Sequence, residues 1–226
     1  MRNLTSYELH TGKLTKPVVF GVVSDLHDEP YDDLWPLLAS CDALLVPGDV
    51  VNRYTQTSAR GIAFLREAAR RMPTFFSLGN HETKTRQFQT LMQALNGTGA
   101  EILVNRYVPF GECWIGGWYD PEIVRQPDCM DEFERLPGCR VLLCHKPEHY
   151  IKFLRGRDMD LVVAGHAHGG QIRIGSQGLY APGQHFFPKY TKGIVDGRLV
   201  ISAGAGNPCG MPRWGNPCEV LKITLD

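Results

Sequence analysis

Short apolar runs that end in residues able to bind a metal ion occur five times in this sequence, and this repetition constrains the fold most. Each run is continuous and largely aliphatic or aromatic, which is typical of a strand buried on both faces. Strands of an open α/β sheet carry their functional side chains at their carboxyl ends. A turn or loop role explains any one of these motifs but not all five. The side chains that follow the five runs are Asp25 and His27, Asp49, Asn80 and His81, His145, and His166 and His168.

The segment 160–171, DLVVAGHAHGGQ, contains the most informative of these motifs. Its apolar run stops at Gly165, and His166 and His168 follow one residue apart, before a pair of glycines. Neutral imidazole is the commonest side-chain ligand for transition metals. Two histidines with this spacing point to the same side of an extended strand, whereas in a turn they diverge toward two neighbouring ions. Both geometries, and a plain pair of loop histidines, agree with this segment alone.

Strand and helix signals alternate along the chain, which favours an α/β fold. The three short strand signals near residue 110 predict a hairpin-rich stretch and the start of a second sheet. Residues 1–16 are expected to be a polar lead-in. The elements expected from the pattern are helices over 32–40, 58–72 and 83–95 and after Pro147, and strands over 18–24, 43–46, 74–78, 102–105, 107–110, 113–117, 139–144, 161–164, 171–174, 193–195, 199–203 and 219–224.

Length and composition limit the classes of protein to which the chain can belong. A chain of 226 residues is expected to form one domain over 1–226. The 24 basic and 24 acidic residues give a net charge of zero, which argues against a broad nucleic-acid footprint. No apolar stretch approaches ~18 residues, so we expect no membrane span, and the start does not resemble a signal peptide. The seven cysteines show no CxxC spacing and are interpreted as reduced thiols of a cytoplasmic protein. The oligomeric state cannot be read from the sequence.

The candidate ligands combine carboxylate, amide oxygen and imidazole groups. This mixture favours Mn, Fe or Zn over Ca or an all-oxygen Mg site. The candidates exceed the needs of one ion, and two ions that share a carboxylate fit better. Such pairs, ~3.5–4 Å apart, serve phosphoester hydrolysis. Arg53 follows the Asp49 motif and has two interpretations, a phosphate contact or a surface ion pair.

The motifs resemble those of a known family. D-x-H at Asp25, G-D at Asp49, G-N-H-E at Asn80, the lone His145 and G-H-x-H at His166 occur in the order found in the calcineurin-like metallophosphoesterase superfamily. They span most of the chain, and the combination is far more specific than any one motif. The ending GHAHGGQ, followed by a Pro/Gly-rich tail with Met-Pro-Arg, most resembles the small bacterial YkuE/YaeI-type phosphoesterases.

The resemblance implies a fold, a reaction and roles for the residues. The fold would be a four-layer αββα sandwich with a dinuclear metal site on one rim. A metal-bridging hydroxide would attack a phosphodiester or phosphomonoester of a small molecule. Asp49 would bridge the ions, and His81 would face the substrate and assist the leaving oxygen. The remaining ligands would be Asp25, His27 and His168 for one ion, and Asn80, His145 and His166 for the other.

Three alternatives to a phosphodiesterase remain at this stage. Phosphoprotein and dinucleoside-polyphosphate phosphatases share the G-N-H-E motif, but they carry Asp-Arg-Gly after the G-D motif, where this chain has Asn52-Arg53-Tyr54. A catalytically inactive scaffold of the same fold would have lost ligands, whereas every matched position here carries the expected residue type. A nuclease is disfavoured by the zero net charge.

Overall fold

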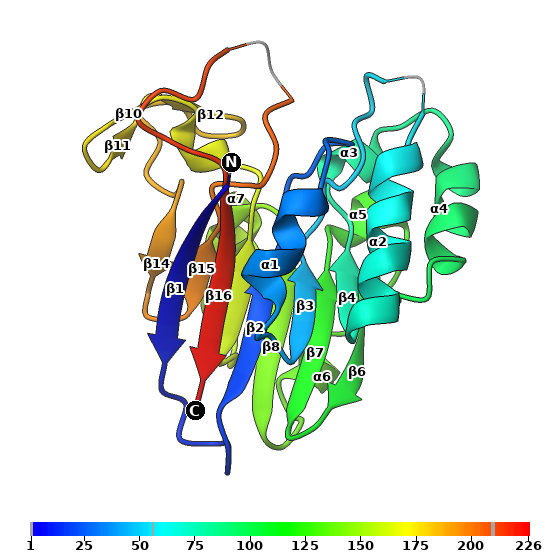
Figure 1. Cartoon of the computed structure of the whole chain (residues 1–226). Helices are drawn as coiled ribbons and strands as arrows, with labels where there is room; N and C mark the ends of the chain where they lie inside the picture. Colours follow the sequence, from blue (N-terminus) through cyan, green and yellow to red (C-terminus); the bar gives the residue numbers. More distant parts are fainter. Residues whose placement is uncertain (1, 56, 209–210) are drawn as a thin grey trace.

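Two six-stranded β-sheets face each other in the computed structural model, which describes residues 2–55, 57–208 and 211–226 (Figure 1). In the first sheet the strands are parallel except where β16 meets β2. This sheet contains the first and the last strand of the chain, β1 and β16. In spatial order this sheet consists of β1 (Asn3–Leu9), β16 (Glu219–Leu225), β2 (Val18–Val22), β3 (Ala43–Val46), β4 (Thr74–Ser77) and β5 (Glu101–Leu103).

The second sheet is also mixed. Its four central strands are parallel, and each outermost strand pairs antiparallel with its neighbour. In spatial order it consists of β14 (Gly193–Val195), β15 (Leu199–Ile201), β9 (Leu161–Ala164), β8 (Cys139–Cys144), β7 (Cys113–Trp118) and β6 (Arg106–Phe110).

Alternation along the buried strands divides the apolar side chains among three cores. Because successive side chains of a strand point to opposite faces, Leu45 of β3 faces the second sheet while Leu44 faces outward. In β8, likewise, Val141 packs between the sheets and Leu142 on the outer side. A strand with both faces buried needs apolar side chains at successive positions. The continuous apolar runs in the sequence predicted such strands.

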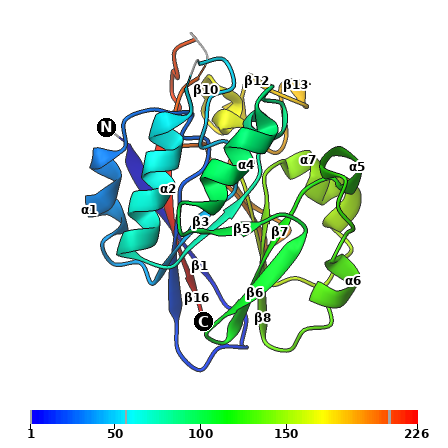
Figure 2. The same ribbon diagram turned by 90° about the vertical axis from the view of Figure 1, so that its right-hand side faces the viewer.

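Helices cover the outer face of each sheet, on opposite sides of the molecule (Figure 2). The four-layer αββα arrangement is thus confirmed. On the first sheet lie η1 (Asp32–Leu34), α1 (Trp35–Leu38), α2 (Ala59–Arg71) and α4 (Phe88–Asn96), and on the second α6 (Met130–Phe133), α7 (Pro147–His149) and the π-helix η2 (Tyr150–Leu154). The short helix α5 (Pro121–Val124) contributes Val124 to the outer core of the first sheet.

The remaining elements lie near the carboxyl ends of the central strands. They are two short helices, α3 (Asn80–Thr83) and η3 (His168–Gly170), and two small hairpins made of β10 (Arg173–Ile174), β11 (Gln177–Gly178), β12 (Tyr180–Ala181) and β13 (His185–Phe186). Figure 1 shows the hairpins as one excursion at the end of the second sheet.

The structure corrects one expectation and refines another. The polar lead-in predicted for residues 1–16 is wrong, because β1 occupies Asn3–Leu9 and pairs with β16. The β1 side chains alternate between solvent and the inter-sheet core, where Tyr7 and Leu9 pack. The stretch near residue 110 does begin a second sheet, but only from β6 onward, since β5 still belongs to the first.

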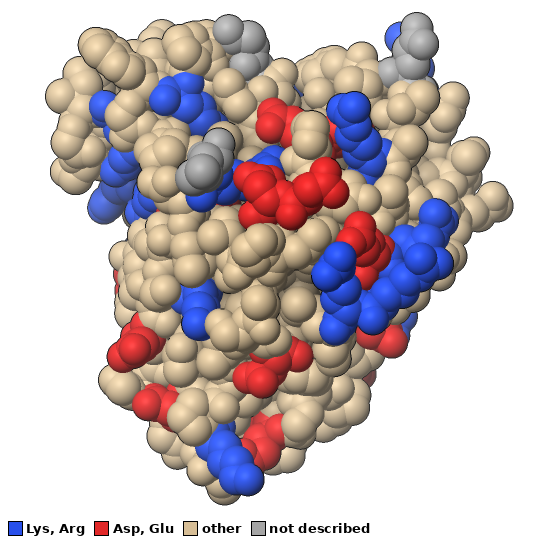
Figure 3. Space-filling model, in the orientation of Figure 1, with Lys and Arg blue, Asp and Glu red and all other residues tan. Residues whose placement is uncertain are grey.

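The surface in the view of Figure 3 carries interspersed basic and acidic side chains rather than one broad field of either sign. Among the described residues, no helix is both long enough and apolar enough to cross a membrane.

Candidate metal centre

The five predicted strand ends meet at one edge of the two sheets. Strands β2, β3 and β4 end at a similar level, because Val22 pairs with Leu45 and Val46 with Phe76. Their segments extend toward those that leave β8 and β9 in the opposite sheet. All seven predicted metal ligands, together with His81, are buried there.

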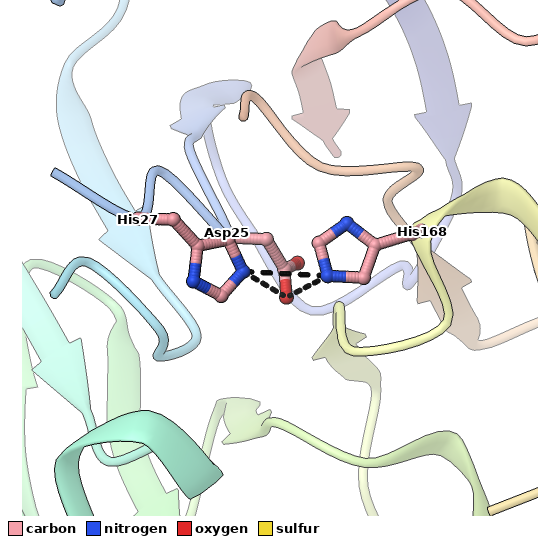
Figure 4. A group of neighbouring side chains, drawn as sticks. All are labelled: Asp25, His27 and His168. Atoms are coloured by element: carbon pink, nitrogen blue, oxygen red, sulfur yellow. Dashed lines mark hydrogen bonds and ion pairs between the residues drawn. The ribbon is translucent and has the colours of Figure 1, made fainter. Parts of the chain in front are cut away.

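The first ligand group contains Asp25, His27 and His168 (Figure 4). Asp25 Oδ1 lies 3.9 Å from His27 Nε2 and 3.6 Å from His168 Nε2. The two Nε2 atoms are 3.3 Å apart. One carboxylate oxygen and two imidazole nitrogens therefore converge on one point, from segments that are 141 residues apart in the chain.

The second ligand group lies on the other side of Asp49. His145 Nε2 is 3.2 Å from Asp49 Oδ2 and 3.2 Å from Asn80 Oδ1, and His166 lies close enough to complete the cluster. Asp49 Oδ2 is also 3.9 Å from His27 Nε2 of the first group. The same carboxylate oxygen therefore faces both groups, which is the position that a bridging ligand must occupy.

Hydrogen bonds orient the two carboxylates and His145. The backbone N–H of His81 donates to Asp49 Oδ1 at 2.7 Å, and that of His166 donates to both oxygens of Asp25 at 3.1 Å. His145 Nδ1 donates to the carbonyl of Pro47 at 2.7 Å, which leaves Nε2 directed at the site. Such a second partner fixes the ring orientation of a metal-binding histidine.

Burial controls the charge of the site. Desolvation lowers the pKa of His27 to about 3 and that of His168 well below its ordinary value, so both imidazoles are neutral near pH 7, as metal binding requires. Desolvation alone would raise the pKa of Asp49, but the neighbouring His145 holds it well below its ordinary value. Asp49 therefore stays ionised.

The ligand segments have unusual backbone conformations. Positive φ angles are uncommon outside glycine and cost about 1–2 kcal/mol each. They persist where the surrounding structure imposes them, often at functional sites. Five of the predicted ligands have positive φ: Asp25 (53°), His27 (54°), Asp49 (56°), His166 (66°) and His168 (45°).

Two motif glycines make room for the carboxylates. A Cβ on Gly79 would lie 2.1 Å from Asp49 Oδ1, and one on Gly165 would lie 2.2 Å from Asp25 Oδ2. No side chain fits at either position. Steric crowding therefore explains why glycine occupies the positions before Asn80 and His166.

Glu82 is a residue of the site to which the sequence analysis assigned no role. Its carboxylate accepts the backbone N–H groups of Asp49, Val51 and Gly79, at 2.8, 3.1 and 2.7 Å. Glu82 is fully buried, and desolvation raises its pKa to about 7. Glu82 thereby joins the loop after β3 to α3. Its place in the G-N-H-E motif was the sequence signal that could have indicated this role.

His81 is arranged differently from the other histidines. Its Nδ1 accepts the backbone N–H of Arg53 at 3.2 Å, so the neutral ring carries its proton on Nε2. Burial lowers its pKa. The ring lies edge-on to that of His27, with 4.4 Å between the centroids, and close to Asp49. An imidazole whose Nδ1 is used and whose Nε2 is protonated is suited to donating a hydrogen bond.

A cavity of about 420 Å³ opens over the metal-facing side chains. Arg53, Lys84 and Lys146 line it together with His81. The guanidinium of Arg53 lies over the ring of Tyr54, 4.7 Å from its centroid, and among the described residues it is not beside a carboxylate. Of the two interpretations of Arg53, the surface ion pair is therefore not seen in the described part of the chain.

Arg213, in the carboxyl-terminal loop, is a second residue to which the sequence analysis assigned no role. Its Nη2 lies 2.8 Å from His168 Nδ1 and donates to the carbonyl of Gly206, also at 2.8 Å. Its place in the Met-Pro-Arg tail was noted, but no local pattern connects it with a histidine 45 residues earlier.

The donor set fits two metal ions. Two clusters of nitrogen and oxygen donors share one carboxylate, their imidazoles are neutral or can become so, and the backbone around them is strained. Asp25, His27 and His168 are suited to hold one ion, Asn80, His145 and His166 the other, and Asp49 both.

Comparisons with known proteins agree with this geometry. The family model described as calcineurin-like phosphoesterase matches residues 18–170. The chain is 28% identical to the uncharacterized protein YpbG of Bacillus subtilis, over 96% of this chain and 86% of that protein. It is 28% identical to phosphodiesterase YaeI of Escherichia coli, over 81% and 70% of the two chains.

An uncharacterized metallophosphoesterase of Campylobacter jejuni is also 28% identical, over 83% of this chain. Here the chain spans about half of the relative's length, 51%. The family match covers more than half of the chain and includes every predicted ligand, from Asp25 to His168. The chain therefore belongs to the calcineurin-like phosphoesterase family.

Proposed function

We propose that this chain hydrolyses phosphoesters of small molecules, phosphodiesters in preference to phosphomonoesters, with two metal ions. The observation that carries the proposal is the position of Asp49 Oδ2, which faces His145 Nε2 at 3.2 Å and His27 Nε2 at 3.9 Å. The relative YaeI of Escherichia coli is named a phosphodiesterase, which supports the preference for diesters.

The ligand chemistry favours Mn, Fe or Zn at both positions. When bound, such ions supply Lewis acidity for the phosphoryl oxygens and for the activation of water. The buried and hydrogen-bonded ligands hold the two positions in advance. We also propose a cytoplasmic location, because the seven cysteines show no CxxC spacing and are interpreted as reduced thiols.

His81 has the role of assisting the leaving group. In hydrolysis the oxygen of water forms a bond to phosphorus, the bond from phosphorus to the leaving oxygen breaks, and that oxygen gains a proton. His81 Nε2–H lies beside the metal ligands with its other nitrogen held by the Arg53 N–H. In the proposed reaction it would donate this proton to the leaving oxygen. Arg53, Lys84 and Lys146 offset the negative charge of the phosphoryl group.

The test compares bis-p-nitrophenyl phosphate with p-nitrophenyl phosphate on metal-stripped protein reloaded with Mn²⁺. We expect the diester to be cleaved faster. His81→Ala should retain the wild-type metal content, measured by mass spectrometry, and lose about 10²–10⁴-fold in kcat on diphenyl phosphate, whose phenolate needs a proton more than p-nitrophenolate does. His10→Ala is the matched control, because His10 is exposed and far from the site.

Each other outcome contradicts a defined part of the proposal. Faster monoester cleavage would replace the diesterase by a phosphatase of the phosphoprotein or dinucleoside-polyphosphate kind. Wild-type turnover in His81→Ala would remove the role of His81. Absence of both metal and turnover would identify an inactive scaffold.

A further inference from the structure

A second, smaller cavity adjoins the one over the metal ligands. Its volume is about 280 Å³. Three residues, Gln171, Tyr180 and Met211, line both cavities, so the two lie side by side. The residues around the smaller cavity are uncharged and mostly apolar: Gln171, Ile172, Leu179, Tyr180, Phe186 and Met211.

The smaller cavity is built by segments that connect directly to the first ligand group. Gln171 follows η3, the short helix that begins at His168. Its side-chain amide donates to Asn207 Oδ1 at 2.9 Å and to the carbonyl of Met211 at 2.8 Å. The hairpin excursion and the carboxyl-terminal loop are thereby held together beside the metal ligands.

Large apolar side chains are exposed around this cavity. Phe186 of its wall is 71% exposed and Met211 is 47% exposed. Ile174, Phe187 and Trp214, in the same two segments, are 79%, 69% and 77% exposed. These five are half of the large hydrophobic residues that are exposed in the described part of the chain. Apolar surface gathered beside a site of polar chemistry indicates a binding region.

We propose that the smaller cavity binds an alkyl or acyl chain of the substrate, attached close to the scissile phosphoester. This inference rests on the proposed function and specifies its substrate class as amphiphilic phosphoesters. The shared wall places the apolar cavity beside the phosphoester position, and the cations Arg53, Lys84 and Lys146 belong to the other cavity only. One site therefore offers a charged half and an apolar half.

A nucleobase fits the smaller cavity less well than an aliphatic chain. The polar edge of a base needs hydrogen-bond partners when it is buried. The amide nitrogen of Gln171 already donates twice within the protein. An aliphatic chain requires no such partner and gains from every methylene that leaves water.

The test uses p-nitrophenyl alkyl phosphates with ethyl, butyl and octyl chains, as dissolved monomers, on the Mn²⁺-reloaded full chain. We expect kcat/KM to rise by about 10-fold or more from ethyl to octyl, since complete burial of one methylene corresponds to up to about fourfold. The octyl-to-ethyl ratio should fall toward one in Phe186→Ser and decrease in Met211→Ser. Phe187→Ser is the matched control, because Phe187 is similarly exposed but lines neither cavity.

The inference and the proposed function fail in different ways. Equal kcat/KM for all three chains overturns the apolar site but leaves the phosphodiesterase intact. Equal loss of the ratio in Phe186→Ser and Phe187→Ser overturns the assignment to this cavity. If no ester is hydrolysed, calorimetric binding of octyl phosphate and ethyl phosphate tests the site separately. Tighter octyl binding that is lost in Phe186→Ser supports it, and equal binding overturns it.

Discussion

The candidate metal ligands position one another through their backbone groups. Asp49 accepts the N–H of His81, and Asp25 accepts the N–H of His166. Each carboxylate is therefore held by a segment that carries another functional residue. His145 is coupled to Asp49 more directly, because their side-chain atoms are 3.2 Å apart. Each member of this pair shifts the pKa of the other.

We expect metal binding to displace a proton from His145. Burial alone would lower the pKa of His145, but the carboxylate of Asp49 raises it to about 9. Near neutral pH the metal-free protein therefore holds a proton on His145 that a metal ion must replace. Calorimetric titration with Mn²⁺, in buffers of different ionisation enthalpy, should give about one proton from this residue. Apparent affinity should rise with pH up to about 9.

Replacement of His145 by Asn provides the comparison, because it should reduce the proton release by about one per chain. Unchanged release in His145→Asn would contradict the assignment. The stability of the metal-free fold should change with pH in the opposite direction to the metal affinity. A raised pKa means that the protonated ring stabilises the metal-free fold fully below 6.5, and that this contribution is lost as the pH rises through about 9.

At the scale of elements, the crossing from the first sheet to the second occurs at a close contact. The chain leaves β5 and enters β6 within two residues, and Asn105 at this crossing has a φ of 48°. Its side-chain oxygen accepts the N–H of Tyr119, just beyond β7, at 2.9 Å. Gly117 of β7 packs directly against β5, where a Cβ would lie 2.2 Å from the carbonyl oxygen of Leu103.

Gly117→Ala should therefore force the two sheets apart at this edge. We expect the free energy of unfolding to decrease by about 1–3 kcal/mol, the usual cost of overpacking, because the clashing atom belongs to the backbone and cannot rotate away. Urea unfolding measures the change. Gly156→Ala is the control, since its Cβ would meet no atom within 4 Å, and it should stay within about 0.5 kcal/mol of the parent protein. Equal stability of both variants would show that the contact relaxes easily.

At the scale of the whole molecule, Glu219 connects segments from both sheets. This fully buried residue begins β16. Its carboxylate accepts from Thr5 Oγ1 at 2.9 Å, from the backbone N–H of Ala203 at 2.7 Å, and from the ammonium of Lys192. Strand β1, the segment before β14 and the loop after β15 are thus joined at one side chain.

Glu219→Ala should reduce the stability of the whole fold. Removal of the carboxylate leaves buried donors without an acceptor and separates Lys192 from its partner, so we expect a loss of about 3 kcal/mol. Thermal and urea unfolding measure it. Glu101→Ala is the comparison, because the pair of Glu101 with Arg106 is about half exposed and should contribute at most about 1 kcal/mol. Similar losses in the two variants would contradict the connecting role.

Much of the fold and of the site followed from local pattern. Continuous apolar runs predicted β2, β3, β4, β8 and β9, and each ends beside the ligands read from the sequence. This worked because a strand buried on both faces has a local signature, and because residues just past such strands meet at one sheet edge. The family and the four-layer fold are confirmed. The roles of the ligands and the extent of the domain over 1–226 stay predictions.

Tertiary structure decided what depends on partners distant in the chain. Strand β1 alternates and has few apolar residues, and it becomes a strand only because β16, more than 200 residues later, offers it a pairing edge. The contact of Arg213 with His168, the three backbone groups gathered by Glu82 and the apolar cavity likewise arise from segments that the fold brings together. Local sequence determined which residues form the strands and follow their ends, because periodicity is a local property. Only packing decided which distant groups meet there.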